Sequence, residues 1–108
     1  MHKAKFLNRN SVIEKLRKIA VRTASRDKNI KKIVLFGSLA SDTHTGTSDA
    51  DLLIILKESS YRMIDRIPGL MLHFVKAPVP VDIIAYTENE VNAIPFAQRA
   101  IREGIELT

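Results

Sequence analysis

A pair of aspartates in this 108-residue sequence has the chemistry and spacing of a metal site. Asp49 and Asp51 are separated by one residue and lead into an apolar run at residues 52–55. Side chains alternate between two faces in an extended chain, so both carboxylates should point to the same side. Adjacent carboxylates repel each other unless a cation lies between them, and Mg2+ is often bound by carboxylates together with substrate phosphates. The pair therefore predicts a site for a divalent metal ion.

A Gly-Ser pair, Gly37 and Ser38, ends the preceding apolar run, and Asp49 follows eleven residues after the serine. Glycine lets the backbone approach a ligand closely, and serine adds a hydroxyl and an N–H beside it. We expect a short helix over residues 38–41, with its N-terminus toward a phosphate group. Taken together, the Gly-Ser pair and the two aspartates indicate a site for a metal ion and a nucleotide.

The elements that must position these residues alternate between helix and strand. Ser11 and Glu14 form a capping-box pattern that predicts the start of a helix reaching about residue 26. Apolar runs predict strands over residues 32–36, 51–56 and 81–86, with the second strand buried on both faces. The expected fold class is α+β, in the order α-β-α-β-α-β-α, with helices packed on a three-stranded mixed sheet. The chain is expected to form a single domain over residues 1–108.

In the second half of the chain, proline, glycine and capping residues predict where helices begin and end. Residues 59–75 are ambiguous: Tyr61, Ile64 and Ile67 fit one helix. Pro68 and Gly69 should interrupt that helix, since proline cannot donate to the helix ladder, and residues 70–75 are either a second short helix or an extended segment. Thr87 and Glu90 repeat the capping-box pattern ahead of a last helix. Pro95 should kink or restart that helix, and the helix is expected to stop at Gly104.

Composition and charge narrow the classes of function. The chain has no cysteine, and neither a signal-peptide core nor an apolar run of membrane-spanning length is seen, so we expect a cytoplasmic protein with no membrane partner. Residues 1–32 contain eleven Lys or Arg and two acidic residues. This basic segment is either a solvated helix face or a contact for an acidic partner or for phosphates. Because no aromatic residues are interleaved with these charges, nucleic acid is not expected as the main partner.

The chain as a whole resembles the minimal nucleotidyltransferases, the antitoxin-like branch of the DNA polymerase β nucleotidyltransferase superfamily. The resemblance rests on three motifs, Gly37-Ser38, Ser48-Asp49-Ala50-Asp51-Leu52 and Val81-Asp82-Ile83-Ile84. Residues 100–107 are similar to the terminal helix of that branch. A third aspartate that opens a third strand makes the combination more specific than either motif alone.

The resemblance implies a two-metal transfer of a nucleotidyl group, most simply AMP from ATP, to a hydroxyl acceptor. Asp49, Asp51 and Asp82 would be the catalytic residues and would hold two Mg2+ ions. Gly37, Ser38 and Ser48 would bind the nucleoside triphosphate. In such sites the metal ions stabilise the attacking and leaving oxygens of an in-line displacement, and the protein supplies position and charge.

The resemblance also suggests a partner, and it leaves an alternative open. Relatives act as antitoxins beside HEPN-type ribonuclease toxins, so a toxin of this kind is the expected protein partner and acceptor. A second copy of the chain is the other source of an acceptor surface. Leu39 and Ser41 stand where many relatives carry arginines, which favours the alternative of a non-catalytic module that binds nucleotide or neutralises its partner by contact.

Overall fold

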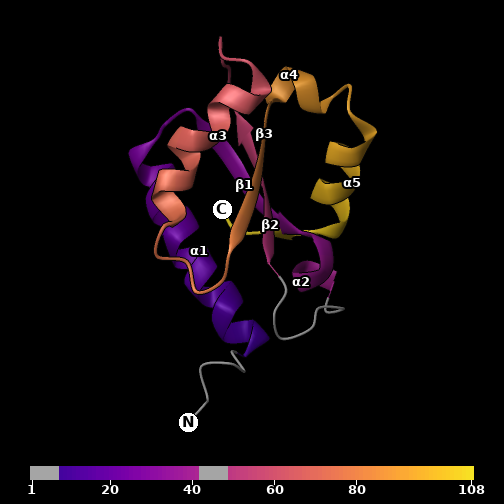
Figure 1. Cartoon of the computed structure of the whole chain (residues 1–108). Coiled ribbons are helices and arrows are strands. Elements are labelled where there is room, and N and C mark those ends of the chain that lie inside the picture. The colour runs from indigo at the N-terminus through magenta and orange to yellow at the C-terminus, as the bar shows by residue number, and fades with distance from the viewer. Residues whose placement is uncertain (1–7, 42–48) are drawn as a thin grey trace.

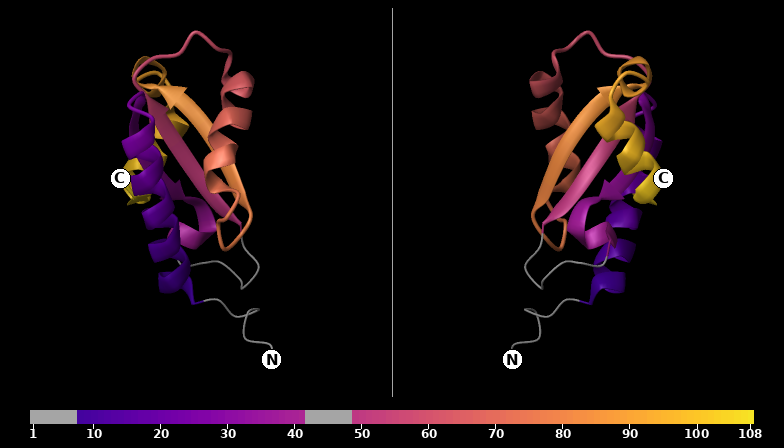
Figure 2. Two further views of the ribbon diagram at one scale, coloured as in Figure 1. Left: turned by 90° about the vertical axis from the view of Figure 1, so that its left-hand side faces the viewer. Right: turned by 90° about the vertical axis from the view of Figure 1, so that its right-hand side faces the viewer.

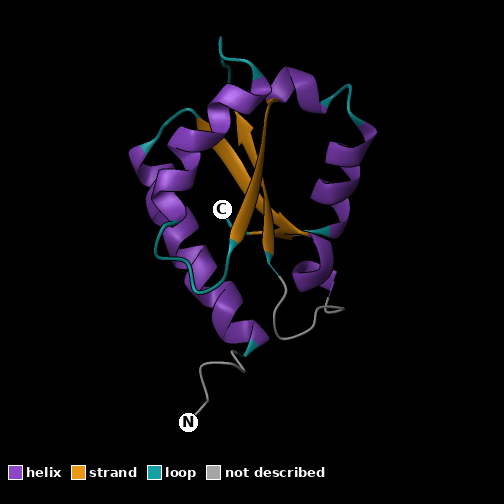
Figure 3. Ribbon diagram, in the orientation of Figure 1, coloured by secondary structure: helices purple, strands orange, loops and turns teal. Residues whose placement is uncertain are grey.

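The computed structural model describes residues 8–41 and 49–108 and shows a β-sheet with helices on both faces (Figure 1). Helices and strands alternate along most of the chain (Figure 3). In chain order the elements are α1 (Arg9–Arg26), β1 (Ile30–Phe36), α2 (Gly37–Ser41), β2 (Ala50–Leu56), α3 (Met63–Met71), the 3-10 turn η2 (Leu72–Phe74), β3 (Val81–Thr87), α4 (Glu88–Val91), α5 (Pro95–Glu103) and β4 (Ile105–Glu106).

The sheet is mixed, as predicted, with the strand order β3-β2-β1-β4. Strand β2 runs antiparallel to β1 and parallel to β3, and β4 runs antiparallel to β1. The expectation of three strands is wrong by one short strand. The terminal helix ends at Glu103, and Ile105 and Glu106 pair with Leu35 and Val34 of β1. The following residue, Leu107, is almost fully buried, so its burial holds this last segment against the sheet.

Helices cover both faces of the sheet (Figure 2). Each face has its own apolar core. Leu52 and Ile54 of β2 face α1, α3 and η2, whereas Leu53 and Ile55 face α4 and α5. This alternation follows from the two-residue period of a strand. All residues of β2 except Asp51 are buried, which confirms the prediction of a strand covered on both faces.

The ends of two helices differ from the predictions. Helix α1 begins at Arg9, two residues before the expected cap, because the side chain of Asn8 accepts hydrogen bonds from the backbone N–H groups of Asn10 and Ser11. Helix α3 continues through Pro68, where an interruption was expected. The carbonyl that loses its N–H donor there belongs to Ile64, whose side chain is 70% exposed, so water can reach this turn of the helix.

The capping and restart predictions for the C-terminal half are confirmed. Thr87 and Glu90 form a reciprocal capping box at the start of α4. Pro95 occupies the first turn of α5, where its missing N–H has no intrahelical role. Within the described residues, no helix combines the length and the apolar character that crossing a membrane requires.

Candidate functional site

Two of the predicted aspartates lie opposite each other on neighbouring strands. Asp51 of β2 is paired in register with Asp82 of β3, and its partner on the other side is Phe36 of β1. Neighbouring strands lie about 4.8 Å apart, so the register brings these two carboxyl-bearing residues side by side. Parallel strands align their starting ends, and each aspartate is the second residue of its strand.

The alternation of side chains fixes the face on which these carboxylates lie. Leu53 of β2 and Ile84 of β3 pack in the core under α4 and α5, and each is two residues after one of the aspartates. Asp51 and Asp82 therefore point to the α5 side of the sheet, at its open end beyond the core. Asp49 directly precedes β2 and is exposed.

The electrostatics of Asp51 show that the three carboxylates interact. Partial burial raises the pKa of Asp51 above its ordinary value, and the negative charges of Asp82 and Asp49 raise it further. The folded protein thus binds a proton at Asp51 more tightly than an isolated aspartate does. A cation between these carboxylates would relieve the same repulsion.

Gly37 is fitted tightly against this group. Its backbone has φ +79, a conformation that residues with a side chain adopt only with strain. A Cβ at this position would overlap with Oδ2 of Asp51 and lie 3.2 Å from Cγ of the same side chain. The sequence places a glycine here because the turn from β1 into α2 runs directly over the Asp51 carboxylate.

Helix α2 is held from outside by the first helix of the chain. Arg9 Nε donates to the carbonyl of Leu39 at 2.8 Å, and its Nη2 donates to the carbonyl of Ala40 at 2.9 Å. Leu39 itself is buried. The turn that follows Gly37 is therefore fixed by packing and by a charged donor at its end.

The aspartates supply oxygen donors suited to a hard divalent cation, but these donors lie at the open end of the sheet and do not enclose a site. The donors are carboxylates on one face, which suits Mg2+. Among the described residues, no three His, Cys, Asp or Glu side chains are grouped closely enough to enclose a metal ion. Ser48, predicted to bind nucleotide, lies outside the described residues. The roles of Asp49, Asp51, Asp82, Gly37 and Ser38 remain predictions that this arrangement supports.

A cleft that was not predicted from the sequence adjoins Gly37. Its volume is about 260 Å3, and it lies between the end of β1, α2 and α5. Phe96, Arg99 and Glu103 of α5 line it opposite Gly37 and Ser41. The rings of Phe36 and Phe96 meet edge to face, with their centroids 5.3 Å apart. The spacing of these α5 residues, three and then four apart, is that of a helix face, a signal available in the sequence.

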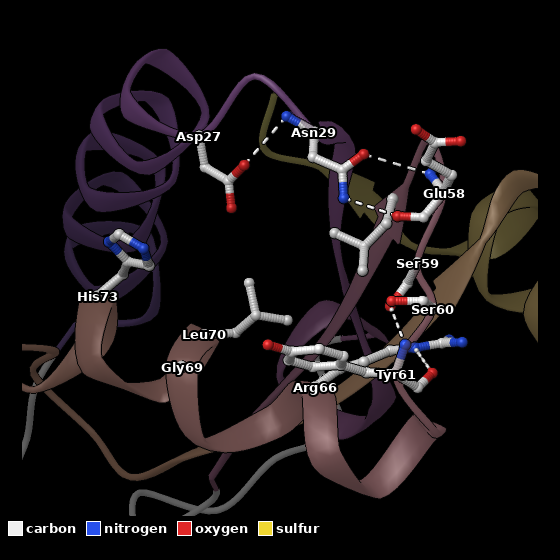
Figure 4. Close-up of a pocket in the computed structure, with 11 residues that line it drawn as sticks. Asp27, Asn29, Glu58, Ser59, Ser60, Tyr61, Arg66, Gly69, Leu70 and His73 are labelled. Carbon is white, nitrogen blue, oxygen red and sulfur yellow. Dashed lines mark hydrogen bonds between the residues drawn. The ribbon is translucent and has the colours of Figure 1, made fainter.

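A second hollow lies at the other end of the sheet, away from the carboxylates (Figure 4). It has a volume of about 410 Å3 and is lined by the end of α1, the segment after β2 and α3. The side chain of Asn29 bridges across its edge, donating to the carbonyl of Glu58 and accepting from its N–H. None of the predicted site residues lines it, so it is separate from the candidate site.

An ion pair between a buried arginine and a half-buried glutamate connects α3, α4 and β3. Arg66 of α3 is 7% exposed and binds Glu90 of α4 through two hydrogen bonds of 2.7 and 3.0 Å. The same guanidinium donates to the carbonyls of Tyr61 and Ala85. The hydrogen bond from Arg66, together with that from the N–H of Thr87, lowers the pKa of Glu90 to about 2. The pair connects α3 to the end of the strand that carries Asp82.

Comparisons with known proteins find a matching family model and solved structures of similar fold. Residues 13–107 match the sequence model of the family described as nucleotidyltransferase domain. A provisionally assigned nucleotidyltransferase from Sulfolobus solfataricus has a similar structure, with a TM-score of 0.70 and 20% identity over 98% of this chain and 87% of that chain. A toxin–antitoxin structure with AMP-PNP has a TM-score of 0.63 and 17% identity over 85% of this chain and 72% of that chain. No curated protein matches the sequence significantly.

Proposed function

The chain belongs to the family of nucleotidyltransferase domains, and from this premise we propose that it transfers a nucleotidyl group, AMP from ATP, to a hydroxyl acceptor. The observation that carries the proposal is the register of β2 and β3, which sets Asp51 beside Asp82 under the turn at Gly37. Among the described residues, neither aspartate is hydrogen-bonded to a base, so the pair suits positioning and charge rather than covalent catalysis.

Each residue has a role that its position supports. Asp49, Asp51 and Asp82 would hold two Mg2+ ions, and these ions would supply charge stabilisation for an in-line displacement at phosphorus. Gly37 leaves space for the Asp51 carboxylate and presents backbone beside it. Ser38 offers a hydroxyl and an N–H for a phosphate oxygen. Asp82, the more exposed of the paired aspartates, is the one open to the acceptor.

The acceptor is proposed to be a side-chain hydroxyl on a partner protein, specifically a HEPN-type toxin. The support is the structural likeness to a chain in a toxin–antitoxin structure with AMP-PNP, an analogue of ATP. The basic face of α1 offers an electrostatic contact for an acidic region of such a partner, because Lys15, Lys18 and Arg22 are exposed.

A second function is favoured by one specific feature. Helix α2, of sequence Gly-Ser-Leu-Ala-Ser, contains no basic residue. If nothing else supplies positive charge to the phosphates, turnover would be slow, and the protein would act by binding nucleotide and covering its partner. The two functions differ in one outcome, which is whether nucleotide becomes covalently attached to the partner.

Binding is tested first, by thermal unfolding with Mg2+ and ATP. Ligand that binds only the folded state raises the melting temperature, and a concentration of 100 times Kd stabilises by about 2.7 kcal/mol. The wild type should show this rise with Mg2+ and ATP together. Asp51→Asn should not, because it removes a charged oxygen ligand.

Asp65→Asn is the matched control, since Asp65 is an exposed aspartate on α3 paired locally with Arg62. This variant should keep the full response to Mg2+ and ATP. An equal response from the wild type and Asp51→Asn would place the nucleotide elsewhere and overturn the assignment. Transfer is then tested with labelled ATP and the candidate toxin. Covalent label on the toxin supports the enzyme, and tight binding without label supports the second function.

A further inference from the structure

The cleft beside Gly37 is built from groups that a nucleotide could use. It has a volume of about 260 Å3 and is bordered by α2 on one side and by Arg99 and Glu103 of α5 on the other. Pockets that take a whole drug-sized molecule measure about 300–1,000 Å3. The cleft is thus sized for one part of a nucleoside triphosphate. Gly37 borders both the cleft and the Asp51 carboxylate, so the part of the nucleotide in the cleft would be the phosphates that lie nearest the carboxylates.

The negative charge expected around the carboxylates favours a positively charged side chain nearby. Three carboxylates and a triphosphate together carry more negative charge than two divalent ions neutralise. Helix α2 carries no basic residue. Arg9 is close to that helix, but its guanidinium donates to the carbonyls of Leu39 and Ala40. Arg99 is the one basic residue that lines the cleft within the described part of the chain.

Arg99 is available for this role. Its side chain is exposed on α5 and forms no hydrogen bond or ion pair with the described residues. Phe96 precedes it by three residues on the same face and packs against Phe36, the neighbour of Gly37. This contact fixes the face of α5 that carries Arg99 against the end of β1.

We propose that Arg99 binds the terminal phosphates of the nucleoside triphosphate from across the cleft and supplies the positive charge that α2 lacks. The proposal rests on the proposed function, because it assumes that the triphosphate lies at Gly37 and Asp51. A guanidinium presents paired donors that match phosphate oxygens, and its charge persists at all relevant pH values. Glu103, one helical turn further along the cleft, opposes the same phosphates.

The test compares affinities for ATP, ADP and AMP, each with Mg2+ at one ionic strength, by calorimetric titration. Arg99→Gln should weaken ATP binding about tenfold, weaken ADP binding less and leave AMP binding unchanged. Arg99→Lys should keep part of the affinity, because it keeps the charge and loses the paired donors. Glu103→Gln should strengthen ATP binding, since it removes a repulsive charge.

Arg102→Gln is the matched control. Arg102 is an exposed arginine on the same helix that does not line the cleft, so its removal should leave all three affinities unchanged. Equal ATP affinity in the wild type and Arg99→Gln would overturn the proposal, as would an equal loss for AMP and ATP. Failure of the wild type itself to bind ATP would refute the proposed function, a separate result.

Discussion

Substitution of Gly37 by alanine tests how tightly the turn and the carboxylate group are fitted together. Two costs are expected. The first is backbone strain, because φ is +79, and the left-handed region costs about 1–2 kcal/mol for a residue with a Cβ. The second is displacement of the Asp51 carboxylate, which overlaps with the new Cβ. Forcing that side chain off its preferred rotamer costs about 1 kcal/mol.

The two costs can be separated by a second substitution, Asp51→Ala. It removes Oδ2 and Cγ and leaves Cβ of residue 51, which would be 3.4 Å from the new Cβ, an ordinary contact. Gly37→Ala should therefore cost about 2–3 kcal/mol in the wild type and about 1–2 kcal/mol in the Asp51→Ala background, because the strain remains and the overlap is gone. In a chain of this length, 1 kcal/mol corresponds to about 4 °C in Tm.

The assay is a double-mutant cycle of chemical and thermal unfolding, without metal and at one pH. A coupling of about 1 kcal/mol between residues 37 and 51 is the expected result. The same cost of Gly37→Ala in both backgrounds would refute the contact with Asp51. A cost below about 0.5 kcal/mol in the wild type would refute the need for glycine in this turn.

Three further outcomes follow from the charges. The pKa of Glu90 falls from 4.5 to about 2 beside Arg66, and stability from this pair should be complete above about pH 5 and lost as the pH falls toward 2. That pKa difference corresponds to about 3 kcal/mol, and because the Glu90 side chain is 35% exposed, solvent screening reduces this to about 1–2 kcal/mol. In urea unfolding across this pH range, Glu90→Gln should lose less of its free energy of unfolding at low pH than the wild type does. Asp51→Asn should raise the Tm of the metal-free protein at pH 7, because the raised pKa of Asp51 means that its ionised form destabilises the fold; an unchanged or lower Tm would contradict this. Charge reversal on α1 should slow association with the proposed toxin partner and leave ATP binding unchanged, as stopped-flow and thermal-shift measurements would show. The residues to reverse are Lys15, Lys18, Arg22 and Arg26.

The sequence predicted the parts of the fold that depend on local pattern. The three long strands carry continuous apolar runs, so burial on both faces of β2 could be deduced from residue type alone. The reciprocal capping of Thr87 and Glu90 depends on four consecutive residues, so it could be recognised from the local sequence alone. The cap of α1 was placed at Ser11 because it belongs to a capping-box pattern, and Asn8, which does cap the helix, has no such partner.

What could not be predicted depends on contacts between distant segments. A two-residue strand such as β4 has no period to detect, and it exists because β1 offers it an edge. The pair of Arg66 and Glu90 joins residues 24 positions apart, and neither residue type indicates its partner. The cleft could not be predicted from the apolar positions of the last helix, because those positions indicate its buried face and not the polar face that carries Arg99. For the candidate site, the Asp-x-Asp pattern indicated a shared face, whereas the pairing of Asp51 with Asp82 required the register of β2 and β3.

That register also bears on local order. The hydrogen bond from the N–H of Ala50 to the carbonyl of Pro80, 2.9 Å long, closes the β2–β3 ladder at the end where the two carboxylates face each other. Like charges directly opposite each other weaken strand pairing, so this end of the sheet frays first when no cation is bound. A divalent ion there would add a crosslink between two strands that are already paired in the sheet and whose chain connection passes through α3 and η2. Amide exchange at Ala50 should therefore slow when a divalent cation binds, because the cation would stabilise the hydrogen bond to Pro80 that closes this end of the sheet.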